Sequence, residues 1–111
     1  MDMPTYVDGV FYLYKIVESN DVVNTIHLEN LNKRVWFCDR GITDRLRSQL
    51  EANNVEVQRK IRIPQYREIG SMNVLQIDDT FYKVYNAYHF TDTDGFKKTD
   101  ITLVNWSDDR D

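Results

Sequence analysis

The chain has little of what marks several large classes of protein. Cys38 is the only cysteine in 111 residues, so no disulfide can form within the chain, and we expect a reducing compartment. The longest unbroken apolar run, Val10 to Tyr14, is far too short to span a bilayer. The sequence does not open with a basic segment followed by an apolar run, so no signal peptide is visible. These absences predict a soluble intracellular protein.

Glycine and proline are also scarce, with four and two residues against seven Tyr, five Phe and two Trp. This balance favours strands over disorder, and the length suits one domain with a single small core. The four glycines are isolated, so the sequence contains no Gly-rich phosphate loop. His27, His89 and Cys38 are scattered and the carboxylates form no recognisable acid–base pair. We therefore expect no enzyme and no cofactor.

Charge is unevenly distributed along the chain. The net charge is −4 and the pI is about 5.1, which argues against a protein that binds nucleic acid with its whole surface. Residues 33–67 hold nine basic and four acidic side chains, whereas residues 68–111 hold four basic and nine acidic ones. Such blocks are typical of a solvated surface, and they also suit a protein that meets copies of itself or different neighbours on opposite sides.

Alternating apolar residues and many β-branched or aromatic side chains predict a strand-rich chain. The clearest strand is Val55–Ile63, where only Arg59 interrupts the apolar face. Alternation along Phe81–Phe90 would put Val84 and Tyr88 on the same face. A short turn at Asp79-Thr80 precedes that strand. The strands expected are Val10–Val17, Thr25–Leu31, Arg34–Asp39, Val55–Ile63, Val74–Asp78, Phe81–Phe90 and Asp100–Trp106.

One helix is expected after Gly41. Ile42, Leu46 and Leu50 recur every four residues and form an apolar stripe that we expect to be buried against the sheet. Thr43 is a suitable N-cap, and Asn53 and Asn54 can end the helix. The chain is thus expected to be mainly β, a small antiparallel β-barrel or sandwich with one short helix packed on it. We expect a single domain over residues 1–111, with a polar start (1–8) and an acidic tail (107–111).

The stretch from His89 to Val104 raises the question of a metal site. With Gly95 at position 6 of a calcium loop, Asp92 and Asp94 fall at positions 3 and 5, but Phe90 and Ile101 fall where carboxylates are needed. The metal interpretation fails. Asp-Gly is instead a strong turn signal, which predicts a long hairpin with the adjacent strands as its arms.

Two groups of residues are candidate contact sites. The hairpin tip has both signs of charge and an aromatic ring directly after the turn, which favours an assembly element: Asp92, Asp94, Gly95, Phe96, Lys97 and Lys98. The alternative is a solvated turn with Phe96 folded onto its own sheet. The second group is basic, with Tyr66 nearby, and would contact phosphate or a neighbouring protein, unless it is simply solvated: Arg59, Lys60, Arg62 and Arg67.

Three pieces of the chain resemble the small head-closure (head–tail connector) proteins of long-tailed bacteriophages that infect Gram-positive bacteria. "DGVFYLYKIVE" (8–18) is similar to the opening strand of that family. Residues 34–63 resemble its aromatic strand, turn, short helix and strand ending in Arg-Ile. "DDTFYKVYNAYHFTDTDGFKKTDITLV" (78–104) is similar to its closing hairpin, with the signature "DG…TD-I-T-L". The resemblance covers 8–104 and departs from the family at Cys38-Asp39, where a pair of carboxylates is expected.

The resemblance implies a non-enzymatic virion protein at the head–tail junction, made in the host cytoplasm. It implies a ring of copies with the portal and adaptor above and a tail terminator or tail completion protein below. Packaged DNA would pass through the lumen without sequence-specific binding, and no membrane is involved. Because acidic side chains repel DNA, we expect acids to face that channel, from Asp92 and Asp94 or from the tail residues Asp108, Asp109 and Asp111. Two alternatives are a small β-barrel adaptor or inhibitor module unrelated to the virion and, more distantly, a small hydrolase.

Overall fold

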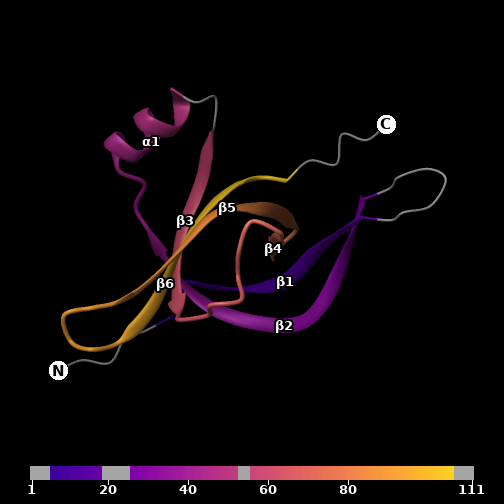
Figure 1. Cartoon of the computed structure of the whole chain (residues 1–111), viewed down its shortest axis with the longest axis horizontal. Coiled ribbons are helices and arrows are strands. Elements are labelled where there is room, and N and C mark those ends of the chain that lie inside the picture. Colours follow the sequence, from indigo (N-terminus) through magenta and orange to yellow (C-terminus); the bar gives the residue numbers. More distant parts are fainter. Residues whose placement is uncertain (1–5, 19–25, 53–55, 107–111) are drawn as a thin grey trace.

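The computed structural model describes residues 6–18, 26–52 and 56–106. Its order of elements is β1 (Gly9–Glu18), β2 (Ile26–Arg40), α1 (Asp44–Glu51), β3 (Val57–Pro64), β4 (Asn73–Ile77), β5 (Thr80–Thr91) and β6 (Lys97–Asn105). The strands close into one antiparallel barrel in the order β1-β2-β3-β6-β5-β4, with β4 pairing back to β1 (Figure 1). The expectation of a mainly-β barrel with one short helix is confirmed.

The barrel interior is filled by apolar side chains from the inner faces of all six strands, because alternate residues of a strand point to opposite faces. On β3 this alternation is clear at Ile61 and Ile63, which are buried, and Val57 is buried on the other side of a register shift between Val57 and Arg59. Ile69, from the loop between β3 and β4, joins the same cluster. The full buried cluster consists of Phe11, Leu13, Phe37, Ile61, Ile63, Ile69, Leu75, Ile77, Val84, Ile101 and Leu103.

Two local features differ from the expectation drawn from the sequence. The segments 25–31 and 34–39 form one long strand, because Asn32 takes a positive φ of 57° inside β2 and its N–H donates to Asn30 Oδ1. The β4–β5 turn consists of Asp78 and Asp79, with Ile77 paired to Thr80, so the expected turn was one residue late. Asn and Asp tolerate the left-handed conformation that these positions need.

A bulge in β5 reverses its inner and outer faces. The pairing with β6 shifts between Val84 and Asn86, so one extra residue lies in β5. Val84 is buried, whereas Tyr88 is 61% exposed. The prediction that Val84 and Tyr88 share a face is therefore wrong, and Ala87 packs against the core instead.

Helix α1 has the expected start but not the expected packing. Thr43 Oγ1 accepts a hydrogen bond from the N–H of Leu46 at 3.1 Å, as an N-cap should. However, the helix has no buried residue, and Leu46 and Leu50 are only half-buried. The prediction that this apolar stripe is buried against the sheet is wrong. Figure 1 shows the helix to one side of the barrel, near β3.

The molecule is elongated because two hairpins extend past the barrel. Its dimensions are 56 × 35 × 23 Å. The β1–β2 ribbon and the β5–β6 hairpin lie on opposite sides of the barrel in Figure 1. None of the described residues forms a helix that is long and apolar enough to cross a membrane.

Candidate assembly surfaces

The tip of the β5–β6 hairpin is organised by Asp92. Its Oδ1 accepts hydrogen bonds from the N–H groups of Asp94 and Phe96, both at 2.9 Å. Its Oδ2 lies 2.6 Å from Lys98 Nζ. The hydrogen bond from Lys98, supported by those from the backbone, lowers the pKa of the Asp92 carboxyl. Both carboxylate oxygens are thus used to shape the turn, and Gly95 takes the positive φ of 86°.

The other residues of the tip divide into buried and exposed groups. Lys98 is largely covered, with 14% of its side chain exposed, while Asp94 and Lys97 are exposed. The Phe96 side chain is half-buried. It is therefore neither fully exposed to solvent nor part of the core, the two alternatives that the sequence left open. The hairpin itself is confirmed. Its role in assembly stays a prediction, and the charge available there is that of Asp94 and Lys97.

The basic group on β3 does not form a free cationic site. Arg62 Nε and Nη2 donate to the two carboxylate oxygens of Asp100 at 2.6 and 2.9 Å, and its guanidinium lies 5.1 Å from the centre of the Phe90 ring. The hydrogen bond with Asp100 raises the pKa of Arg62. Arg67 donates from Nε to Gln65 Oε1 and is exposed beyond the strand. Arg62 therefore ties β3 to β6, and Lys60 is half-buried on the same strand.

A polar cluster near one end of the barrel was not expected from the sequence. Arg59 donates from Nε and Nη2 to Asp39 Oδ1 at 3.2 and 2.8 Å, and its guanidinium lies 5.2 Å from the centre of the buried Phe37 ring. Burial lowers the pKa of Arg59, but the hydrogen bond and charge of Asp39 outweigh it and leave that pKa raised. The one signal in the sequence was Arg59 itself, which interrupts an apolar face.

The residues Asp8 and Gly9 close the same region. The N–H of Asp8 donates to the carbonyl of Phe37 at 3.0 Å, and its Oδ2 accepts from the N–H of Asp39 at 2.8 Å. A Cβ on Gly9 would lie 2.7 Å from Phe37 Cζ, so only glycine leaves room for this ring. The Asp-Gly pair at the start of β1 is therefore a packing motif.

Exposed aromatic side chains lie on the outer faces of two strand pairs. Tyr12 and Trp36 project from β1 and β2, and Val10 is directly opposite Trp36 in the register. Tyr85 and Tyr88 project from β5. Sequence reasoning missed the β5 pair as a surface because the bulge was not visible in the pattern. Aromatic side chains are enriched where proteins meet, so both faces are candidate contact surfaces.

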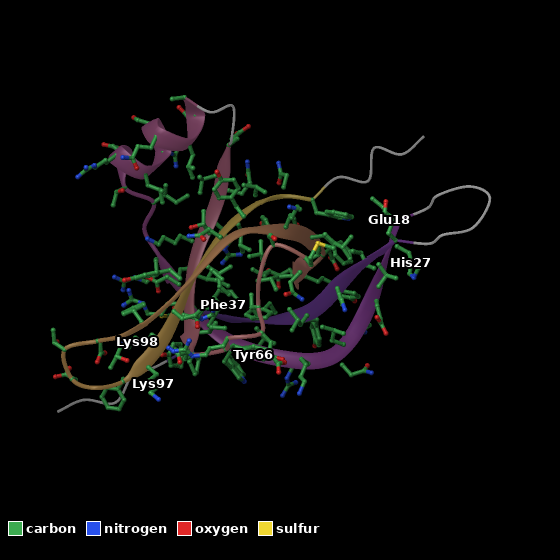
Figure 2. The ribbon with its side chains drawn as sticks, viewed as in Figure 1. Glu18, His27, Phe37, Tyr66, Lys97 and Lys98 are labelled. Carbon is green, nitrogen blue, oxygen red and sulfur yellow. The ribbon has the colours of Figure 1, made fainter. Side chains whose placement is uncertain are left out.

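The residues weighed for chemistry lie apart. His27 is exposed on the β1–β2 ribbon (Figure 2), while His89 Nδ1 lies 2.7 Å from the hydroxyl oxygen of buried Thr99. Burial raises the pKa of the Cys38 thiol, on β2. Among residues 6–18, 26–52 and 56–106, no three His, Cys, Asp or Glu side chains gather as metal ligands. The expected acids Asp108, Asp109 and Asp111 lie outside the described residues.

A small groove lies beside the β1–β2 ribbon. It has a volume of about 320 Å³ and is lined by Lys15, Leu31, Glu68, Met72 and Asn73. The Asn73 amide is already used, because its Nδ2 donates to the Tyr14 carbonyl and its Oδ1 accepts from the N–H of Gly70. The polar atoms of Asn73 therefore support the fold.

Comparison with known proteins adds no family. No protein-family model matches the sequence, and no curated protein matches it.

Proposed function

We propose that the chain is a structural virion protein, a head-closure subunit that assembles into a ring below the portal and adaptor of a long-tailed bacteriophage. The ring would hold packaged DNA in the head and offer a docking face to a tail terminator or tail completion protein. The ring assembly is inferred from the resemblance of residues 8–104 to that family. The closed barrel supports the proposal because it is a fold suited to a ring subunit.

Residues from the first and third pieces that carry the resemblance have structural roles in this barrel. Gly9 makes room for Phe37 at the start of β1. In the closing hairpin, Gly95 forms the turn, Thr99 is fully buried and Asp100 holds Arg62. These structural roles support the resemblance as one of architecture.

The observation that carries the proposal is that much of the chain projects from the barrel. Helix α1 has no buried residue, and Ile42, Leu46 and Leu50 along its apolar stripe are half-buried. Trp36 and Tyr88 expose half or more of their surface on separate strands. A free monomer would leave these two aromatic side chains in water, whereas an assembly subunit covers them with neighbours. This favours an assembly subunit over a free-standing adaptor.

The proposed channel contacts rest on charge. Because Asp92 is paired with Lys98, the acid that remains available at the hairpin tip is Asp94. Acidic groups repel the phosphate backbone, so a lumen lined by Asp94 would let DNA slide without binding. The proposal therefore assigns the lumen to the hairpin tip, with the acidic tail as the second source of acids.

A nonsense mutation in the gene, within the phage genome that carries it, tests the proposal. We expect heads that package DNA and then lose it, accumulating beside free tails, and we expect a plasmid copy to restore joined particles. Normal joined particles without the protein would refute the proposal and would favour the unrelated adaptor or inhibitor module. The matched control is a silent change at the same codon.

A further inference from the structure

Two strands of the barrel continue well beyond their partners on one side. β2 pairs with β1 along its length but with β3 only at Cys38, Asp39 and Arg40, so residues 26–37 have no described strand on that side. β5 pairs with β4 only from Thr80 to Lys83, so residues 84–91 have β6 on one side and no described strand on the other. One side chain reaches this second stretch, since Gln65 Nε2 donates to the Phe90 carbonyl at 3.3 Å.

These two free edges lie on opposite sides of the molecule. In the closed order β1-β2-β3-β6-β5-β4, three steps separate β2 from β5 in either direction. Figure 2 agrees, because Glu18 and His27 mark the end of the β1–β2 ribbon and Lys97 and Lys98 lie on the β5–β6 hairpin across the barrel. A contact that joins opposite sides of identical subunits is heterologous, and it generates a ring when the rotation closes.

The free edge of β5 lacks the charged side chains and proline that usually protect an edge strand from pairing. Natural edge strands are blunted by charged side chains or proline, because their N–H and C=O groups template another strand. Residues 84–91 contain no Asp, Glu, Lys, Arg or Pro, and they expose Tyr85 and Tyr88. This edge has the composition of a strand that is covered in the assembled state. The bulge at Tyr85 interrupts only the start of this edge, so residues 86–91 remain available for pairing.

The charges at the two edges differ. β2 exposes Lys33 and Arg34, and also Glu29, next to its free edge. The free stretch of β5 has no Asp, Glu, Lys or Arg, and exposed Asp78, Asp79, Asp94 and Lys97 lie in the turns beyond it. Parallel in-register pairing of two β2 edges would place Lys33 and Arg34 beside their own copies, whereas the β5 edge brings no like charge against them.

We infer that the free edge of β5 in one copy adds to the free edge of β2 in the next copy, so that a sheet running between subunits closes the ring. This rests on the proposed function, and it identifies the partner of both edges as a second copy of this chain. Main-chain hydrogen bonds supply the affinity, while Trp36 and Tyr88 are covered at the seam.

Crosslinking of single-cysteine variants tests the pairing. In a Cys38→Ser background, one version carries Lys33→Cys on β2 and a second, tagged version carries Tyr88→Cys on β5. A short bismaleimide should crosslink the mixture into a dimer severalfold more than either version alone, because a heterologous contact joins position 33 of one copy to position 88 of another. Met72→Cys, exposed on neither edge strand, replaces either cysteine as the matched control.

Every variant is compared with its parent by thermal melting, so a folding defect is recognised. Equal crosslinking of one version alone, or a mixture no better than the Met72→Cys control, overturns the pairing.

The two proposals fail in different ways. If the mixture does not crosslink but the nonsense mutant still leaks DNA, the pairing is wrong and the proposed function stands. If the mixture crosslinks but the mutant phage joins heads and tails normally, the proposed function is wrong and the pairing stands.

Discussion

Gly9→Ala should destabilise the barrel through one contact. The added Cβ would lie 2.7 Å from Phe37 Cζ, closer than real Cβ atoms approach another atom, and 3.0 Å from Phe37 Cε2, which is tighter than most Cβ contacts. The Phe37 ring cannot easily move aside, because it is fully buried and lies under the Arg59 guanidinium. It also stacks on the Phe11 ring, with 6.3 Å between the two ring centres. Overpacking of this kind costs about 1–3 kcal/mol.

A smaller effect opposes this loss. Replacing glycine by alanine restricts the unfolded chain, which stabilises by about 0.4–1 kcal/mol where the native backbone allows it. The clash is larger, so we expect a net loss of about 1–2 kcal/mol, which lowers the melting temperature by roughly 5–15 °C for a domain of this size. Gly41→Ala is the control, because its Cβ would meet nothing within 4 Å and its φ lies outside the left-handed region.

Thermal melting of a double-mutant cycle is the assay. In a Phe37→Leu background the smaller side chain leaves room for the new methyl group, so Gly9→Ala should cost markedly less than in the wild type. Equal losses in the two backgrounds, or no loss in the wild type, would refute the proposed contact between Gly9 and Phe37.

Three further outcomes are expected. Leu50→Ala should lower the free energy of unfolding by less than about 1 kcal/mol, because the helix has no buried residue; a loss of 2 kcal/mol or more in a melt would mean that α1 packs on the barrel. Lys98 holds the pKa of the Asp92 carboxyl below its ordinary 3.8. The stabilisation of the folded state by this ion pair is therefore complete above about pH 3.8 and disappears as the pH falls through the lowered pKa. Asp92→Asn should therefore reduce the fall in melting temperature on acidification below about pH 4, and an unchanged acid profile would contradict this. Arg62→Met should cost about 1–3 kcal/mol by leaving Asp100 unpaired with only 11% of its side chain exposed, and adding Asp100→Leu should recover part of the loss; additive losses in denaturant titrations would argue against the pair.

Much of the fold could be predicted because local patterns and tertiary contacts agree in these segments. The alternation around Ile61 and Ile63 follows from one buried face, and the Asp94-Gly95 turn and the Thr43 cap are local chemistry. Errors arose where one residue changed the geometry. The bulge at Tyr85 reversed the faces of β5, and Asn32 joined two expected strands.

The candidate surfaces were harder to predict for a different reason. An apolar stripe indicates that a helix face will be covered, but not whether its own sheet or another chain covers it, and this decides the burial of Leu50. Arg62 looked like a free cation because its partner, Asp100, is 38 residues away in the sequence. Ion pairs between distant strands depend on register, which a single sequence does not specify.

Electron cryomicroscopy of the isolated head–tail junction tests the central claim most directly. We expect a closed ring of this chain between the portal–adaptor assembly and the tail, with β2 of each copy beside β5 of the next and Asp94 facing the DNA channel. A junction that contains no copy of the chain would contradict the proposed function, and a ring in which both of these strand edges face solvent would contradict the inferred seam.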